Sequence, residues 1–307
     1  MKAKWATCAG FAACILATSF ADEPANPARN DSSMPSYRTI VSEVRVTFFV
    51  TDANNHSVDL VDRSDFAVVD DDLVVREFRS VARAEETTLD LVVLIDASAS
   101  VSSSLPKIMG QVRQLVRHQQ TANDSTSVVA FAGLNPALLC AHDCGSVEAN
   151  NRLNALKPGG LTPLFDALAY SATLVSDRHQ PSTRPVVILF SDGNDTTSKT
   201  SAQEALRAVI GSGALLYAID LNTAGSSSYG SGALQRMAEA TGGRTFSLPE
   251  SDQVLETVLE DLRTSYVVTY QLPGSRVGYH SLRILPKHNL NLRFHCRSGY
   301  YYGTSVP

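Results

Sequence analysis

The stretch LDLVVLIDASAS, residues 89–100, decides the fold. Its first part is an almost unbroken apolar run, which is typical of a parallel strand that is buried on both faces. The run ends in one carboxylate and two hydroxyls at alternate positions, Asp96, Ser98 and Ser100. Oxygen atoms in this position fit a nucleophile site, a phosphate or metal site, or an ordinary capped turn. The rest of the sequence decides between these three roles for the oxygen atoms.

Three more apolar runs of the same kind follow, at residues 127–133, 184–192 and 213–221. Around them, apolar residues recur at helical spacing in the segments 105–116, 164–172, 201–210, 232–240 and 251–262. Short apolar strands that alternate with amphipathic helices predict a doubly wound α/β domain with a mainly parallel sheet. We place this domain at residues 87–263.

The segments on either side of this domain have a different pattern. Residues 39–84 and 265–303 contain alternating apolar and polar residues, rich in β-branched and aromatic side chains and separated by turns. Each segment is too small to form a stable sheet alone. We therefore expect the two segments to pair with one another in a small antiparallel β-sandwich-like unit, into which the α/β domain is inserted.

The N-terminus has the pattern of a targeting segment. Two lysines and an apolar stretch, residues 5–16, precede the small residues Ser19 and Ala21. This predicts a cleavable signal peptide at residues 1–21 and a secreted or periplasmic protein with no integral membrane segment in the mature chain. Residues 22–38 are rich in Pro, Asn, Asp and Ser and predict a flexible linker.

The charge balance narrows the class of partner. The 307 residues include 26 Lys and Arg against 31 Asp and Glu, for a formal net charge of −5. Long basic runs and alternating basic and aromatic residues are missing from the sequence. This composition argues against a nucleic acid or an anionic membrane surface as the partner.

Polar residues follow the predicted strands at the edge where an open parallel sheet binds its ligands. Thr162 lies in the loop GGLTPLFDAL, residues 159–168, and Asp192 lies in LFSDGND, residues 189–195. Together with the three oxygen-bearing residues of the first strand they offer two carboxylates and three hydroxyls. Hard oxygen ligands of this kind suit Mg²⁺, Mn²⁺ or Ca²⁺. We predict a metal site made of Asp96, Ser98, Ser100, Thr162 and Asp192.

These three motifs, in this order, resemble those of a von Willebrand factor A-type domain with a metal-ion-dependent adhesion site. The resemblance covers residues 87–263, and DASAS, Thr162 and Asp192 correspond to the motif D-x-S-x-S, the threonine loop and the second aspartate of that family. The resemblance implies that the three hydroxyls bind the metal directly and that the two aspartates act directly or through water. It also implies a partner protein that presents Asp or Glu to the metal. The flanking strands are similar to those of secreted bacterial proteins that carry such a domain.

Other readings stay open at this point. A hydrolase would use Ser98 as its nucleophile, but the sequence has no G-x-S-x-G elbow. Phosphoryl transfer through Asp96 would need a nearby cation, and Lys199 is the nearest candidate. A structural scaffold, in which a metal only ties loops together, would have the same ligands. Asp220 follows another strand, and we expect it to stabilise a turn or cap a helix, with an electrostatic contribution to the metal site as the weaker alternative.

We therefore expect a secreted, non-catalytic binding module. The loops after residues 131–133, 191–195 and 220–230 would surround the metal, and the Gly/Ser-rich residues 224–232 would form a mobile element.

Three cysteines remain after residue 21. Cys140 and Cys144 could form a disulfide around a small loop, which leaves Cys296 single, and a metal site made of these cysteines and His142 is the weaker alternative. The histidines are scattered, and we expect them in surface or loop roles.

Overall fold

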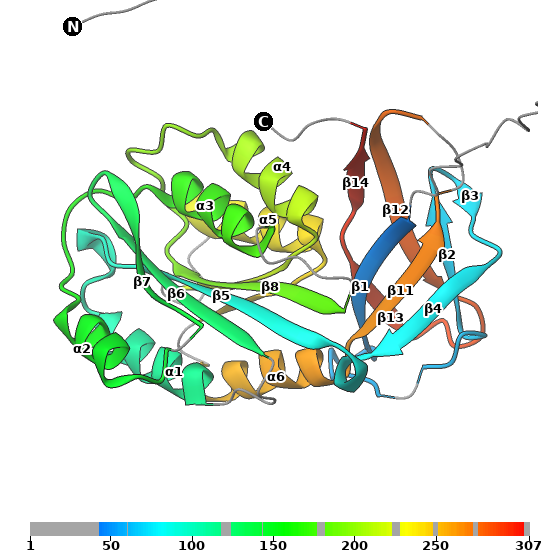
Figure 1. The fold of residues 1–307 in the computed structure, drawn as a ribbon, viewed down its shortest axis with the longest axis horizontal. Coiled ribbons are helices and arrows are strands. Elements are labelled where there is room, and N and C mark those ends of the chain that lie inside the picture. Colours follow the sequence, from blue (N-terminus) through cyan, green and yellow to red (C-terminus); the bar gives the residue numbers. More distant parts are fainter. Residues whose placement is uncertain are drawn as a thin grey trace, which may run out of the picture. The chain divides into compact units, whose positions relative to one another are not determined.

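The computed structural model describes residues 43–59, 61–117, 124–142, 144–176, 182–222, 228–247, 251–272 and 276–303 (Figure 1). The predicted signal peptide and linker lie outside these residues, as do residues 224–227 of the predicted mobile element. All of the described residues belong to one compact unit, Val41–Pro307.

The central sheet confirms the α/β prediction. Its six strands lie in the order β10-β9-β8-β5-β6-β7, and all neighbours are parallel except the pair β6 and β7. The strands are β5 (Thr88–Asp96), β6 (Ser125–Ala132), β7 (Asn135–Ala141), β8 (Thr183–Ser191), β9 (Leu215–Asp220) and β10 (Thr245–Ser247). The opening stretch forms β5, which lies inside the sheet between β6 and β8.

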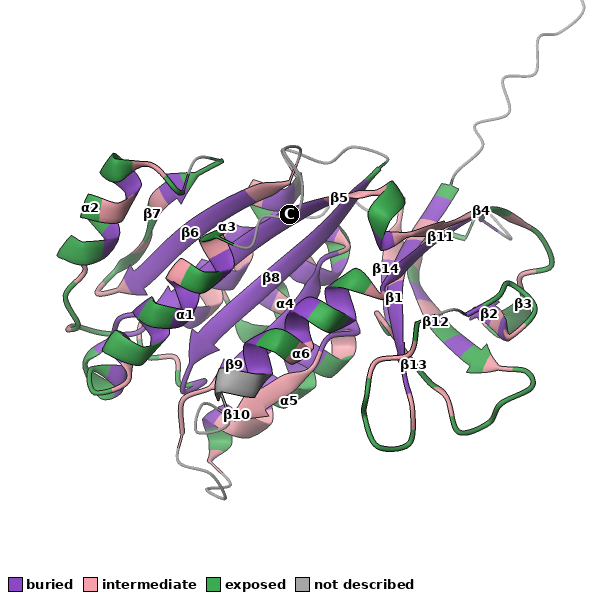
Figure 2. Cartoon of the chain, turned by 90° about the horizontal axis from the view of Figure 1, so that it is seen from below, coloured by how far each residue is buried: buried purple, intermediate pink, exposed green. Residues whose placement is uncertain are grey.

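Helices cover both faces of this sheet, because alternate side chains of each strand point to opposite sides. Leu91, Val93 and Ile95 of β5 pack with α1 (Leu105–Arg117), α2 (Val147–Ala155) and α6 (Ser251–Arg263). Val92 and Leu94 pack on the other face with α3 (Leu164–Ser176), α4 (Ala202–Ser212) and α5 (Tyr229–Thr241). The inner strands β5 and β8 are buried along almost their whole length (Figure 2). This arrangement explains why their sequences are apolar on both faces.

The flanking segments form two antiparallel sheets with the strand orders β13-β1-β11-β4 and β14-β12-β2-β3. Their strands are β1 (Glu43–Thr51), β2 (Phe66–Asp70), β3 (Leu73–Val74), β4 (Phe78–Arg83), β11 (Tyr266–Gln271), β12 (Gly278–Pro286), β13 (Arg293–Cys296) and β14 (Gly299–Tyr302). β1 pairs with β11 and β13, and β2 pairs with β12, so strands from before and after the α/β part share each sheet. The fold is therefore an α/β sheet inserted into a small antiparallel unit, as predicted. The exact domain limits stay a prediction.

A buried arginine contacts both segments that connect the α/β part to the antiparallel unit. The Arg184 guanidinium, from β8, donates hydrogen bonds to the Leu262 carbonyl and the Ser265 hydroxyl, both at 2.7 Å. It also donates to Thr87, at 2.5 Å, and to the Ala84 carbonyl, at 3.4 Å, in the incoming passage around the short 3₁₀ helix Ala84–Glu86. One side chain thus fixes the entry and the exit of the inserted part.

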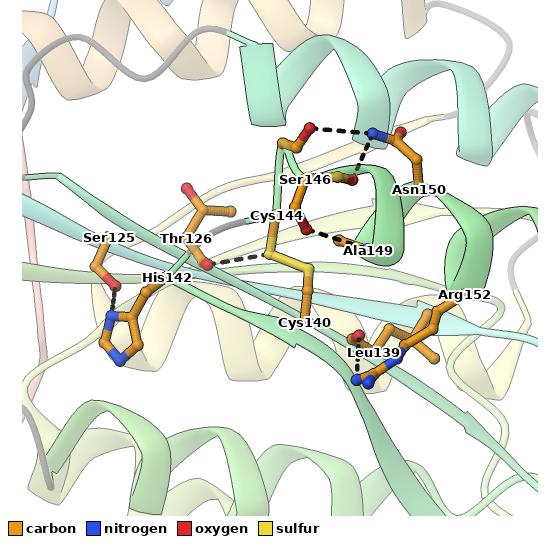
Figure 3. Close-up of a disulfide and its surroundings, with 11 residues drawn as sticks. Ser125, Thr126, Leu139, Cys140, His142, Cys144, Ser146, Ala149, Asn150 and Arg152 are labelled. Carbon is orange, nitrogen blue, oxygen red and sulfur yellow. Dashed lines mark hydrogen bonds between the residues drawn. A yellow bond between two sulfur atoms is a disulfide. The ribbon is translucent and has the colours of Figure 1, made fainter.

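Cys140 and Cys144, which the sequence allowed to form a disulfide, are bonded to each other (Figure 3). It connects β7 to the loop before α2, and both cysteines are buried. Between them, the His142 ring forms a hydrogen bond with the Ser125 hydroxyl, at 3.0 Å. Because both sulfurs are bonded to each other, the alternative of a metal site with His142 is wrong.

Candidate metal site

The first candidate ligands lie at the carboxyl end of β5. Asp96 is the last residue of the strand and is fully buried, and its Oδ1 accepts a hydrogen bond from the Ser98 backbone N–H, at 3.0 Å. The hydroxyls of Ser98 and Ser100 share a hydrogen bond of 3.1 Å. Ser98 is buried and Ser100 is exposed. The three oxygen-bearing side chains therefore lie in a row that begins in the core at Asp96 and ends at the surface at Ser100.

The capped-turn reading of this stretch is not supported by its local geometry. Ser98 immediately precedes the 3₁₀ helix η2 (Ala99–Val101), but its side chain makes no capping hydrogen bond there. Its hydroxyl forms hydrogen bonds with Ser100 and Asp96 instead. The serines are thus grouped with each other and not used to satisfy the start of a helix.

The Thr162 loop lies against the Asp96 loop. The Gly159 N–H donates to the Ala97 carbonyl, at 2.8 Å, and the Ala99 N–H donates to the Gly160 carbonyl, at 3.3 Å. Gly160 has a φ of +80°, and a Cβ there would lie 3.1 Å from the Gly133 nitrogen. Gly160 therefore suits both its left-handed backbone conformation and its close contact with the turn at Gly133. Both of these hydrogen bonds join backbone groups of the two loops.

The third loop begins at the end of β8, next to β5. The Ser191 hydroxyl donates to Oδ2 of Asp96, at 2.8 Å. Asp192 follows directly, is almost fully buried, and its Oδ1 accepts from the Asn194 N–H, at 3.0 Å. Ser191 thus connects the first loop to the third loop, because it contacts Asp96 and directly precedes Asp192.

Two hydrogen bonds connect the second and third loops. The Thr162 N–H donates to the Thr196 hydroxyl, at 2.7 Å, and the Thr196 N–H donates to the Thr162 carbonyl, at 2.9 Å. Asp195 accepts a hydrogen bond from the Phe165 N–H, at 3.3 Å, and so caps the first turn of α3. The loops that carry Asp96, Thr162 and Asp192 therefore form one connected structure.

Three positioning residues were not among the residues predicted from the sequence: Ser191, Asp195 and Thr196. Ser191 and Asp195 lie in the quoted motif itself, one residue before and three after Asp192. Ser191 could have been predicted from the sequence, because its hydroxyl lies at the end of a strand and next to a predicted ligand. Thr196 had no such signal, because its role depends on a contact with a loop 34 residues away in sequence.

The electrostatics of the site fit a bound cation. Burial raises the pKa of Asp96, and the negative charge of Asp192 raises it further. Two carboxylates close enough to repel each other in a water-poor setting would be stabilised by a divalent cation. The donor set of carboxylate and hydroxyl oxygens is the set that Mg²⁺, Mn²⁺ and Ca²⁺ prefer.

Asp220 has the structural role that we expected. It ends β9, and its Oδ1 accepts from the backbone N–H and the side-chain amide of Asn222, at 2.9 and 2.7 Å. The same Asn222 amide donates to the Asp192 carbonyl, at 2.8 Å. Asp220 therefore stabilises a turn that supports the Asp192 loop.

A second acidic cluster lies in the β-sandwich. His280 Nδ1 is 3.0 Å from Oδ2 of Asp71 and 3.5 Å from Oδ1 of Asp70, distances that a metal ion could bridge. The other Asp70 oxygen accepts from the hydroxyls of Tyr270 and Tyr300, both at 2.7 Å. These donors already supply the cluster with hydrogen bonds, so we assign it a role in the sandwich core. His280 is buried, and the expectation of a surface or loop position is wrong for it.

The sequence matches one family. Residues 91–194, about one third of the chain, match the family described as von Willebrand factor type A domain. This segment contains all five predicted ligands. A comparison with curated protein sequences finds no match.

Several solved structures are similar to this chain. A von Willebrand factor type A protein from Catenulispora acidiphila is 12% identical, with 88% of this chain and 77% of that chain covered and a TM-score of 0.47. An aerotolerance-related membrane protein from Bacteroides fragilis is 17% identical, with 57% and 98% covered and a TM-score of 0.45. Proximal thread matrix protein 1 from the mussel byssus, with a zinc-occupied MIDAS motif, is 17% identical, with 63% and 50% covered and a TM-score of 0.48.

The sequence match and the observed sheet agree with each other, since the matched segment runs from β5 to the loop after β8. The von Willebrand factor type A domain is thus the family to which residues 91–194 of this chain are similar.

Proposed function

We propose that this protein is a non-catalytic binding module that holds a divalent cation and, through it, an acidic residue of a partner protein. Asp96, Ser98, Ser100, Thr162 and Asp192 would hold the ion, which would be Mg²⁺ or, in its place, Mn²⁺ or Ca²⁺. The observation that carries this proposal is the connection of their three loops by direct hydrogen bonds around two buried carboxylates.

The charges of the site explain why a partner carboxylate would be bound. Asp96 and Asp192 supply two negative charges, which balance a divalent ion without excess. A bound cation would have a coordination position left for a carboxylate oxygen of the partner. Because Ser100 is exposed while the other four ligands are buried, the open side of the site faces solvent at Ser100. This favours partner binding over a purely structural metal.

The hydrolase and phosphoryl-transfer readings receive no support from the geometry. The Ser98 hydroxyl forms hydrogen bonds with the Ser100 hydroxyl and with the Asp96 carboxylate, so it belongs to the group of oxygen atoms that would bind the ion. Asp96 is engaged by Ser191 and by the Ser98 backbone, and burial keeps it away from solvent. Both groups fit a ligand role better than a nucleophilic role.

The cellular location is part of the proposal. The predicted signal peptide would direct the chain to an oxidising compartment, where the Cys140–Cys144 disulfide would persist. Within the described residues, every helix is too short or too polar to cross a bilayer. Secretion or periplasmic export is therefore the location that we propose.

A calorimetric titration tests the metal site. Mg²⁺ is titrated into the full chain after EDTA treatment and dialysis, and the titration is repeated with Mn²⁺ and Ca²⁺. Saturable heat in the wild type that is lost in Asp192→Ala supports the site. Glu148→Gln is the control, because it removes an exposed carboxylate that pairs with Arg152 on α2 and is not one of the five ligands. Equal heats in wild type and Asp192→Ala would reject the assigned residues.

A further inference from the structure

Three large apolar side chains are exposed at the edge of the sheet that carries the candidate metal site. Leu134 is 66% exposed in the turn between β6 and β7, Leu161 is 50% exposed, and Tyr229 is 84% exposed at the start of α5. Each belongs to a different loop. Apolar side chains that gather around a functional site mark an interaction surface more often than scattered ones do.

Leu134 and Leu161 lie on one side of the site. The Gly133 N–H donates to the Leu161 carbonyl, at 2.7 Å, so the residues next to these leucines are in direct contact. Leu161 immediately precedes Thr162. The turn follows β6, in which Phe131 is paired with Asp96. Both leucines are thus fixed beside two of the candidate ligands.

Tyr229 lies on the side of Asp192. Its neighbour Gly230 packs so tightly against the Asp192 loop that a Cβ on it would lie 2.2 Å from the Asp192 carbonyl oxygen. Gly193, with a φ of +77°, is the residue on the Asp192 loop that contacts Gly230, and a Cβ on it would lie 2.3 Å from the Gly230 carbonyl oxygen. The start of α5 is therefore held against the loop of the last candidate ligand.

We infer that the partner presents its Asp or Glu between large apolar side chains, in an extended segment or loop. The inference rests on the proposed function, because it is the metal-bound carboxylate that places the apolar neighbours over Leu134, Leu161 and Tyr229. When the partner carboxylate coordinates the ion, the residues on either side of it in the partner chain come close to the same three side chains. Polar flanks would leave these side chains without contacts, whereas apolar flanks would bury them.

A peptide selection tests this inference. The full chain, in MgCl₂, is used to select from two phage libraries of constrained loops that have a fixed central Glu or a fixed central Gln and are random elsewhere. The inference expects large apolar residues next to the Glu among the selected peptides. Affinity of a selected peptide should fall about 100-fold in Leu134→Ser/Leu161→Ser, since each leucine contributes about tenfold when buried.

The control variant is Leu285→Ser/Leu290→Ser, which removes two leucines of similar exposure, 45% and 78%, from β12 and the loop after it. Its affinity for the same peptide should change by less than about twofold. The magnesium titration should be unchanged in both variants, which shows that they are folded and that the ion site is intact.

Several results would overturn the inference. Polar residues next to the selected Glu, an unchanged affinity in Leu134→Ser/Leu161→Ser, or no selected peptide at all despite normal magnesium binding would each reject it. Capture of anionic lipid vesicles in place of peptides would assign the surface to a membrane. Failure of the proposed function would look different, because wild type would then bind no magnesium, or Gln peptides would bind as well as Glu peptides.

Discussion

Thr162 and Thr196 hold each other through two hydrogen bonds, one of 2.7 Å to the Thr196 hydroxyl and one of 2.9 Å to the Thr162 carbonyl. The first bond depends on a side chain and the second depends only on backbone. Thr196 therefore fixes a candidate ligand without being a ligand itself. Residues of this kind tune metal affinity by limiting how far a ligand can move.

Replacement of Thr196 should weaken metal binding. We expect Thr196→Val to reduce magnesium affinity by about 10- to 100-fold, the range found for groups that orient a metal ligand. Thr196→Ser keeps the hydroxyl and should stay near wild type. Calorimetric titration of both variants gives the comparison, and equal affinities for Val and Ser would show that the clamp has no part in metal binding.

The contact between Gly230 and the Asp192 loop should not tolerate a side chain. A Cβ on Gly230 would lie 2.2 Å from the Asp192 carbonyl oxygen, so Gly230→Ala should displace that loop and abolish magnesium binding. Gly110→Ala is the matched control, since nothing lies within 4 Å of a Cβ there and the residue is inside α1. That variant should bind normally and gain up to about 1 kcal/mol of stability. Normal binding by Gly230→Ala would disprove the tight contact.

Asp261, which is buried, and His295, which is partly buried, should influence stability in opposite directions between about pH 4 and pH 6.5. Burial raises the pKa of Asp261 to about 6, and its stabilising contribution is complete below about pH 4 and lost as the pH rises through 6. Burial lowers the pKa of His295 to about 4, and its contribution is complete above pH 6.5 and lost as the pH falls through 4. The two effects offset each other in the wild type.

Single substitutions should separate these effects. Relative to wild type, Asp261→Asn should lose stability on acidification from pH 6.5 to 4, because only the His295 contribution remains. His295→Gln should lose stability in the reverse direction, as the pH rises from 4 to 6. Urea unfolding at several pH values measures both. A stability difference from wild type that is the same at every pH would contradict the assigned shifts.

The three cysteines should react differently. Removal of the disulfide by Cys140→Ser/Cys144→Ser should cost about 2 kcal/mol, because the loop that it closes is short. Burial raises the pKa of the Cys296 thiol to about 12, so it should not react with DTNB at pH 8 in the folded protein. Unfolded but unreduced protein without residues 1–21 should expose this one thiol. Rapid reaction of the folded protein would show that Cys296 is accessible.

The sequence predicted the parts of the fold that depend on strong local patterns. β5 and β8 were recognised because both faces are apolar, and the pairing of β1 with β11 followed from the instability of either segment alone. β7 was not predicted, because it is a half-exposed edge strand that contains Pro136. α2 was also missed, since its sequence VEANNRLNA has few apolar positions.

The candidate site was predicted less completely than the fold. The five candidate ligands follow from three motifs, and their loops do contact one another. The contribution of Thr196 and the close approach of Gly193 to Gly230 depend on contacts between distant segments. The buried group of His280 and two aspartates depends in the same way on the pairing of β2 with β12. No local pattern in the sequence indicates contacts of this kind.

The position of a bound ion tests the central claim most directly. Crystals of the full chain grown with MnCl₂ would reveal manganese by its anomalous scattering. We expect one strong peak bounded by Asp96, Ser98, Ser100, Thr162 and Asp192, and its loss in crystals of Asp192→Ala. A peak at Asp70, Asp71 and His280 in place of this site, or an undisturbed peak in the variant, would contradict the account.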